Sequence, residues 1–231
     1  GMVRFVGTAA DAVRARWPEV VAAGSVTDAG RVQAWVVGPG LGTSGAALDV
    51  LAFALRSGLP VCVDADAVTM LANRPRLADE RDPDTTLVLT PHDGEYARFG
   101  EPVGDDRVAA ATTLAKRLRA TVLLKGFTTV IAGPDGQVLV NPARGAWPAT
   151  AGSGDVLSGV IGALLASGMP PMDAAGCAAF VHSLAGDLSA AGAPTGAELS
   201  AAGAPTSASR LADRLPDAIR AVRAASLTSA S

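Results

Sequence analysis

A lone carboxylate follows a run of small residues in the stretch TAGSGD, and the uncharged, helix-like run VLSGVIGALLASG comes directly after it. The backbone N–H groups of Gly152, Ser153 and Gly154 can converge at the start of that helix, where the helix dipole adds about half a positive charge. Such a turn can hold an anion. Asp155 could then take a proton from a hydroxyl group that attacks a phosphoryl group held there. In the alternative interpretation, Asp155 lies in the first turn of an ordinary capped helix, although such a helix needs neither glycine.

Three further polar side chains stand where predicted strands end. Lys125, in LLKGFTT, is one of only two lysines among 19 cationic residues, and a compact charge beside a glycine is consistent with phosphate contact. His92 and Glu95, in TPHDGEYARFG, have the spacing of a first helical turn. The position of His92 at a strand end favours contact with a substrate. His182 lies in an apolar, helix-like stretch, where we expect a structural role.

A glycine-rich turn, VVGPGLGTS, follows another predicted strand. At Gly38, Gly40 and Gly42 the backbone can approach a phosphate closely. The turn is similar to a dinucleotide-binding fingerprint, with Asp64 ending the next strand, but Thr43 stands at the third glycine position. A plain tight turn is therefore the main alternative.

The strand in VCVDADAV ends in two acids, Asp64 and Asp66. Their carboxylates could reach a cleft or hold a metal-bound water. The alternative for Asp66 is that it caps the helix that follows.

Short β-branched runs alternate with helix-length stretches, notably 45–57 and 105–119, and each run ends in glycine, proline or an acid. This alternation predicts a parallel sheet covered on both faces by helices. The stretch TTVIAGPDGQVLVN predicts a hairpin, and everything after Thr150 is predicted to be helical, with a last helix over 207–222. The repeated SAAGAPT, at 189–195 and 200–206, predicts a duplicated surface loop.

The composition favours one folded domain that binds neither nucleic acid nor membrane. The chain has 231 residues, 49% of them hydrophobic and 18% charged, and a formal net charge of −3, so it lacks the broad cationic surface that binds anionic polymers or bilayers. Val156 to Met172 is the longest uncharged run, and we interpret it as a buried helix and its exit. Two cysteines, Cys62 and Cys177, predict reduced, buried thiols. No signal peptide is recognisable, and we expect a cytoplasmic protein.

Six motifs occur together in this order: GPGLG, DADA, TPHDGE, LKGFTT, ATAGSGDVLSGVIGALLASG and AAFVHSLAGDL. Together they resemble the ADP/ATP-dependent NAD(P)H-hydrate dehydratases of the ribokinase-like superfamily. The match runs from about Gly1 to the final helix. The resemblance implies a three-layer α/β/α sandwich with a mostly parallel central sheet, formed as a single domain by residues 1–231.

The resemblance also implies a repair reaction, in which (S)-NADHX and (S)-NADPHX are converted back to NADH and NADPH. The phosphoryl donor is ADP in most bacterial members and ATP in eukaryotic ones, with Mg²⁺ bridging its phosphates. Asp155 would act as base toward the hydroxyl group on the hydrated ring, which takes up a phosphoryl group, and loss of phosphate would restore the double bond.

By the same resemblance, two sets of residues bind the ligands, and no protein side chain is expected as a metal ligand. The substrate side comprises Gly40, Gly42, Asp64, His92 and Asp155. The nucleotide side comprises Lys125, Gly126, Phe127, Thr128, Thr129, Gly152, Ser153 and Gly154.

The chain departs from the family before Gly1, where members usually carry some tens of residues that include a first strand, a glycine-bearing turn and a helix. We therefore expect an N-terminally incomplete domain, either as a fragment of a longer protein fused to an epimerase domain or with these elements supplied from elsewhere. Because family members are often tetramers, we also expect a homo-oligomer. Two alternative functions stay open, namely a vitamin kinase of the same superfamily and a nucleotide-binding module without turnover.

Overall fold

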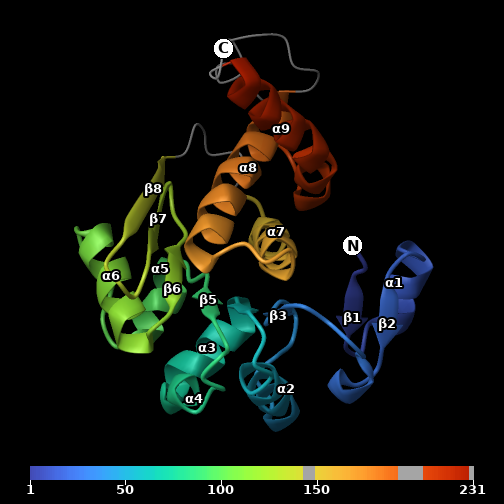
Figure 1. The fold of residues 1–231 in the computed structure, drawn as a ribbon, viewed down its shortest axis with the longest axis vertical. Coiled ribbons are helices and arrows are strands. Elements are labelled where there is room, and N and C mark those ends of the chain that lie inside the picture. Colours follow the sequence, from blue (N-terminus) through green and yellow to red (C-terminus); the bar gives the residue numbers. More distant parts are fainter. Residues whose placement is uncertain (143–148, 192–204, 229–231) are drawn as a thin grey trace.

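The computed structural model describes residues 1–142, 149–191 and 205–228. Its centre is a six-stranded sheet in the order β3-β4-β5-β6-β7-β8 (Figure 1). The strands are β3 (Trp35–Val37), β4 (Val61–Val63), β5 (Leu87–Leu89), β6 (Thr121–Leu124), β7 (Thr128–Ala132) and β8 (Val138–Pro142). The first four are parallel, and β6, β7 and β8 pair antiparallel. The mostly parallel sheet and its terminal hairpin are therefore confirmed.

Helices cover both faces of this sheet because its central strands are apolar on both sides. Val61 and Val63 belong to one core cluster, whereas Cys62, between them, belongs to another on the opposite face. The first cluster packs against α2 (Gly45–Leu55), α3 (Ala65–Asn73) and α6 (Arg107–Leu118), and the second against α7 (Ser153–Ala166) and α8 (Pro171–Ala191). Strands buried on both faces are typical of parallel sheets. The predicted three-layer α/β/α arrangement is confirmed.

Side chains fix the starts of two predicted helices. The hydroxyl of Ser44 accepts the N–H of Ala47 at 3.2 Å, and the carboxylate of Asp106 accepts the N–H of Ala109 at 2.8 Å. Such bonds satisfy N–H groups that have no partner within the helix. Helices α2 and α6 accordingly lie inside the stretches predicted from the sequence. Shorter helical turns are α4 (Arg76–Asp79), α5 (Asp93–Tyr96) and η2 (Ala97–Phe99).

The first part of the chain forms a separate, two-stranded parallel sheet. Its elements are β1 (Arg4–Val6), α1 (Ala10–Arg16), β2 (Val21–Ala23) and η1 (Val26–Asp28). The β-branched run MVRFVG, at residues 2–7, predicts β1, whereas no such run marks β2. Because β2 is short and no part of it is fully buried, it lacks the apolar pattern by which the other strands were recognised.

The last described helix, α9 (Ala208–Thr228), packs against α8 through a small core that includes Leu188 and Leu211. It runs past the predicted end at Val222, because no glycine or proline follows that residue to stop it. Most of the repeated SAAGAPT segment lies outside the described residues. Cys62 is buried as expected, but the expectation for Cys177 is wrong, because its side chain is exposed on α8. Across the described ranges, no helix is long and apolar enough to cross a membrane.

Candidate active site at the mouth of α7

The carboxyl ends of β3, β4, β5 and β6 meet at one edge of the sheet, which is where α/β proteins place their ligands. Asp64 follows β4, His92 lies beyond β5, and Lys125 follows β6. The N-terminus of α7 faces the same edge. A Cβ atom added to Gly154 would lie 3.4 Å from Nζ of Lys125 and 3.9 Å from Oδ2 of Asp64. Residues from distant parts of the sequence therefore converge on the turn singled out above.

Asp64 and Lys125 form the centre of this site. Nζ of Lys125 lies 2.7 Å from Oδ1 of Asp64 and 3.7 Å from an oxygen of Glu95. The hydroxyl of Ser158 donates to the other oxygen of Asp64 at 2.6 Å. Asp64 is 1% exposed, whereas the Lys125 side chain keeps 20% of its surface. A buried carboxylate thus holds a partly exposed ammonium group at the mouth of α7.

The turn before α7 has the conformation that its glycines predict. Gly152 is the N-cap with φ +81°, a left-handed conformation that favours glycine, and no side chain of the described residues caps this helix. The N–H of Ser153 donates to Thr150 at 3.1 Å. The expectation that Ser153 offers its N–H to an anion is therefore wrong, because the turn itself uses that group, and contact of a nucleotide with the other atoms of Ser153 stays a prediction. The N–H groups of Gly154 and Asp155, in the first helical turn, are the ones left for a ligand.

Asp155 is the third residue of α7, within the range of positions predicted, and it is exposed. The pKa of its carboxyl group is raised, first by desolvation at the mouth of the site and second by the negative charge of Asp64, while Lys125 acts in the opposite direction. A carboxylate with a raised pKa accepts a proton more readily than an ordinary one. Asp155 is therefore suited to act as a general base.

His182 has the structural role that the sequence predicts, and it acts on the same turn. The ring is buried, and Nε2 lies 2.9 Å from the backbone oxygen of Ser153. Since a carbonyl oxygen only accepts, Nε2 must carry the hydrogen. Burial lowers the pKa of His182, with the positive charge of Lys125 adding to this effect and the bond to Ser153 opposing it. A neutral His182 thus anchors the start of α7.

His92 and Glu95 form the helix start that their spacing predicts. Nδ1 of His92 accepts the N–H groups of Gly94 and Glu95, and Glu95 accepts the N–H of His92 at 2.9 Å. This is a reciprocal capping box. The ring of His92 still keeps 56% of its surface exposed at the strand end. The capping bonds leave part of the His92 side chain accessible, so contact between His92 and a substrate stays a prediction.

The glycine-rich turn lies next to Asp64, and its tightness follows from close backbone contact. A Cβ atom at Gly38 would collide with the backbone oxygen of Asp64. Gly40 and Gly42 have φ of +63° and +75°, and Oδ2 of Asp66 accepts the N–H of Gly42 at 2.8 Å. Asp64 occupies the N-cap position of α3, without a capping side-chain bond. The capping alternative for Asp66 is therefore wrong, because its carboxylate braces the glycine turn.

The stretch from Lys125 to Thr129 leads out of β6 and into β7. A Cβ atom at Gly126 would collide with the guanidinium of Arg107, which bonds both oxygens of Asp93 at 2.8 and 2.9 Å and the backbone oxygen of Lys125 at 2.9 Å. Phe127 is 71% exposed. The bend beside the site therefore presents an aromatic ring to solvent.

Sequence reasoning missed Ser158 and Arg107. Ser158 lies in an apolar helix four residues after Gly154, and only the fold brings its hydroxyl to Asp64, 94 positions away in the chain. Its one visible signal is that a hydroxyl interrupts an otherwise apolar helical face. Arg107 is one of many arginines, so nothing in the sequence distinguishes it as a residue of the site.

The donor set at this edge fits a magnesium ion that arrives on a nucleotide. Within the part of the chain that the structure describes, no three His, Cys, Asp or Glu side chains are placed to hold a metal together. Asp64 and Glu95 both face the ammonium group of Lys125. Asp155 offers an exposed carboxylate beside the glycine turn at the start of α7. Mg²⁺ commonly binds through one or two carboxylates, waters and the phosphates of a substrate.

The mostly parallel sheet between two helical layers is a ribokinase-like α/β fold, as in a ribokinase-like protein of Enterococcus faecalis with a TM-score of 0.73 and 22% identity over 94% of this chain and 76% of that one. A profile of the NAD(P)H-hydrate dehydratase family matches residues 1–204. The chain belongs to this family.

The relatives described next are both longer than this chain. The bifunctional NAD(P)H-hydrate repair enzyme Nnr of Mycobacterium leprae is 58% identical over 192 residues, which are 83% of this chain and 40% of the relative. The ADP-dependent (S)-NAD(P)H-hydrate dehydratase of Neisseria meningitidis is 42% identical over 185 residues, 77% of this chain and 62% of the relative. This chain thus spans about two fifths of the mycobacterial relative.

Among solved structures, the fold is similar to the ADP/ATP-dependent NAD(P)H-hydrate dehydratase of Bacillus subtilis, co-crystallised with ATP and Mg²⁺. The TM-score is 0.76 and the identity 25%, over 95% of this chain and 81% of that one.

Proposed function

We propose that this chain carries out the ADP-dependent dehydration of (S)-NADHX and (S)-NADPHX, which regenerates NADH and NADPH. The observation that carries the proposal is the position of Asp155. Its exposed carboxylate, with a raised pKa, stands in the first turn of a helix that has no side-chain cap among the described residues, next to the ammonium group of Lys125. A base, an anion-binding helix end and a cation at one point suit phosphoryl transfer to a hydroxyl group.

In the proposed reaction, Asp155 takes the proton of the ring hydroxyl. The oxygen of that hydroxyl attacks the terminal phosphoryl group of ADP, and AMP leaves. The N–H groups at the mouth of α7 and the ammonium of Lys125 stabilise the charge that develops on the phosphoryl oxygens. Cleavage of the bond between carbon and oxygen, with loss of a proton from the neighbouring ring carbon, then releases phosphate and restores the ring double bond. Mg²⁺, when bound, neutralises charge on the phosphates of the donor.

The two ligands would occupy opposite sides of this turn. We place the hydrated ring against Gly40, Gly42, Asp64, His92 and Asp155. We place the nucleotide against the bend from Lys125 to Thr129 and against Gly152, Ser153 and Gly154. In this arrangement the exposed ring of Phe127 offers a flat surface to an adenine base.

The test is recovery of NADH from its hydrate. The protein is incubated with (S)-NADHX, ADP and Mg²⁺, and the nicotinamide absorbance is followed, with (S)-NADPHX and ATP in parallel reactions. We expect the absorbance to return together with stoichiometric AMP and phosphate. Absence of recovery with either nucleotide, by folded protein, would contradict the proposal.

Two other functions give different results in parallel experiments with their own substrates or with ADP alone. A vitamin kinase would accumulate a stable phosphorylated alcohol, for example from pyridoxal or a hydroxymethyl pyrimidine, and would release no free phosphate. A nucleotide-binding module without turnover would bind ADP in calorimetry and form no AMP. The dehydratase is favoured over both because the relatives described above are NAD(P)H-hydrate dehydratases.

The setting that we propose follows from the relatives. The bifunctional members suggest an epimerase domain that is fused to, or associated with, the dehydratase domain formed by residues 1–231. We also propose that the protein is a homo-oligomer in the cytoplasm, where its substrates arise. Sedimentation equilibrium would measure the oligomeric state.

A further inference from the structure

Arg107, the first residue of α6, joins two segments on opposite sides of the candidate site. Its Nη1 donates to both oxygens of Asp93, at 2.8 and 2.9 Å, and its Nη2 donates to the backbone oxygen of Lys125 at 2.9 Å. We propose that Arg107 is a positioning residue that couples the two ligands, so that each ligand strengthens the binding of the other. This role rests on the proposed function, in which the hydrate contacts His92 and the nucleotide contacts the bend from Lys125 to Thr129.

The two segments continue neighbouring strands of the sheet. Asp93 lies beyond the end of β5 and Lys125 follows β6, and a parallel bridge pairs His92 with Lys125. The N–H of Lys125 also donates to the backbone oxygen of Pro91 at 2.8 Å. Beyond this backbone contact, Arg107 bonds one segment through a carboxylate and the other through a carbonyl. The guanidinium therefore adds a side-chain link between the segments, next to the point where the ligands would bind.

The glycine that follows Lys125 is explained by the guanidinium. A Cβ atom at Gly126 would collide with the guanidinium of Arg107. The φ angle of Gly126 lies outside the left-handed region, so the backbone conformation by itself would accept an ordinary residue. The close approach of the guanidinium is thus the reason why this position favours glycine. The bend beside the site is shaped to fit Arg107.

The guanidinium of Arg107 is more shielded than that of a surface ion pair. The Arg107 side chain keeps 24% of its surface, whereas Arg56, paired with Glu80, keeps 60%. Shielded charges are screened less by salt, and a guanidinium that bonds through two nitrogens has a fixed orientation. Its third group, Nε, is buried without a hydrogen-bond partner among the described residues. The two outer nitrogens therefore fix the guanidinium between Asp93 and Lys125.

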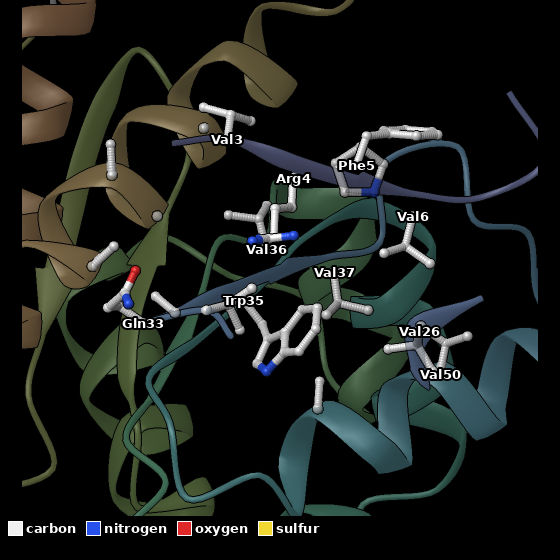
Figure 2. A pocket seen from close by; sticks show the side chains of 18 of the residues that line it. Val3, Arg4, Phe5, Val6, Val26, Gln33, Trp35, Val36, Val37 and Val50 are labelled. Carbon is white, nitrogen blue, oxygen red and sulfur yellow. The ribbon is translucent and has the colours of Figure 1, made fainter. Parts of the chain in front are cut away.

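Both segments expose the side chains that would meet the ligands. The ring of His92 keeps 56% of its surface, and Phe127 keeps 71%. Neither segment lines the pocket of about 670 Å³ between β1 and β3 (Figure 2), so their exposed groups are left to ligands at the carboxyl edge of the sheet. Exposed segments lose conformational freedom when a ligand binds them. Each ligand must therefore order one of the two segments.

A link between the segments makes that ordering common to both ligands. The ligand that binds first orders its own segment, and through Arg107 it also holds the other segment in place. The second ligand then loses less conformational entropy, which gives positive coupling without a change of fold. Because coupling is reciprocal, ADP and the hydrate strengthen each other by the same factor. The nucleotide is thus held most tightly when a hydrated cofactor is present.

The experiment measures the affinity for ADP by calorimetry with Mg²⁺, in the absence and in the presence of saturating NADH. NADH is the product of the proposed reaction, so it occupies the substrate side without turnover. For the wild-type protein, we expect NADH to tighten ADP binding by about fivefold or more. For Arg107→Met, we expect ADP to bind with and without NADH at affinities that differ by less than about twofold.

Three further variants make the result specific. Gly126→Ala keeps every charge but displaces the guanidinium, so it should lose the coupling as well, and it supplies the same test if Arg107→Met does not fold. Arg107→Lys keeps the positive charge without the planar fork, and it should retain only part of the coupling. Arg56→Met, which breaks the surface pair with Glu80, should retain all of it.

Thermal unfolding of each variant separates this role from a structural one. A merely structural arginine would lower the unfolding midpoint when it is replaced, and the ratio of the two ADP affinities would stay at the wild-type value. A positioning residue changes that ratio.

Three results would overturn this role of Arg107. One is a wild-type ratio of ADP affinities in Arg107→Met or Gly126→Ala. Another is an equal loss of coupling in Arg56→Met. The third is a wild-type protein that binds ADP and NADH independently of each other. In all three, both ligands still bind and the proposed function stands. A folded wild-type protein that fails to bind ADP or NADH would instead refute the proposed function, and the coupling with it.

Discussion

Asp64 holds Lys125 at the mouth of α7, with 2.7 Å between Oδ1 and Nζ, although the two residues are 61 positions apart in the chain. The carboxylate is buried and the ammonium group is partly exposed, so the lysine can meet a ligand without leaving its partner. The charge of Asp64 raises the pKa of Asp155, and the charge of Lys125 lowers it. The behaviour of the proposed base therefore depends on this ion pair.

Asp155→Asn should lower the dehydration rate by about 10²–10⁴-fold, because the amide cannot take up the proton of the hydroxyl. The KM for ADP should change little if Asp155 acts on the reacting hydroxyl. Initial rates with (S)-NADHX at varied ADP measure both. A variant with full activity would remove Asp155 from the mechanism.

The same variant should make the protein more stable at neutral pH. Because the pKa of Asp155 is raised in the folded state, its neutral form favours folding, and that contribution is lost as the pH rises through the raised value. Asparagine stays neutral throughout. Thermal unfolding should show a higher midpoint for Asp155→Asn at pH 7 and no difference below the ordinary aspartate pKa. A lower midpoint at pH 7 would contradict the raised pKa.

The pH at which the rate falls on the acidic side of the pH–rate profile, its acidic limb, should depend on the charges of Asp64 and Lys125. Lys125→Met removes the charge that lowers the pKa of Asp155, so the limb should move to higher pH. Asp64→Asn removes the charge that raises it, so the limb should move to lower pH. Titration of the Asp155 carboxyl carbon by NMR checks the same shifts without turnover. Asp79→Asn, in a surface pair with Arg119, is the control that should move nothing.

His182→Ala should destabilise the protein by about 1–3 kcal/mol, because the buried carbonyl of Ser153 loses its donor. His182→Gln retains an N–H donor and should cost less. Since the pKa of His182 is lowered by burial, the wild-type protein should also lose stability as the pH falls below the ordinary histidine value, and the glutamine variant should lose less. Urea unfolding of the three proteins at pH 7 and pH 5 tests this. Equal acid sensitivity would exclude His182 as its source.

Ser158→Ala should cost about 1.5–3 kcal/mol of stability, because the buried carboxylate of Asp64 loses a charge-assisted hydrogen bond. Ser167→Ala is the matched control, since the hydroxyl of Ser167 bonds only the backbone of its own helix end at an exposed position. That change should fall within about 0.5 kcal/mol of zero. Chemical unfolding measures both. Similar values for the two variants would mean that Ser158 does not support Asp64.

The sequence by itself determined the elements with strong periodic patterns and the residues at their ends. The runs around β4, β5 and β6 predicted a buried parallel sheet because each is apolar without interruption, and parallel strands bring their carboxyl ends to one edge. That rule placed Asp64, His92 and Lys125 near one another before any contact was known. The glycines and Asp155 marked the mouth of α7 through local backbone chemistry, which needs no partner from elsewhere.

Tertiary structure alone decided which of these groups touch. The bonds of Ser158 to Asp64 and of His182 to Ser153 join segments that no periodicity connects, and the use of the Ser153 N–H within its own turn depends on the conformation of the chain before it. The separation of β1 and β2 from the main sheet was also invisible in the sequence. Strand pairing depends on which backbone edges meet in space, and a short strand carries too few side chains to specify its neighbour.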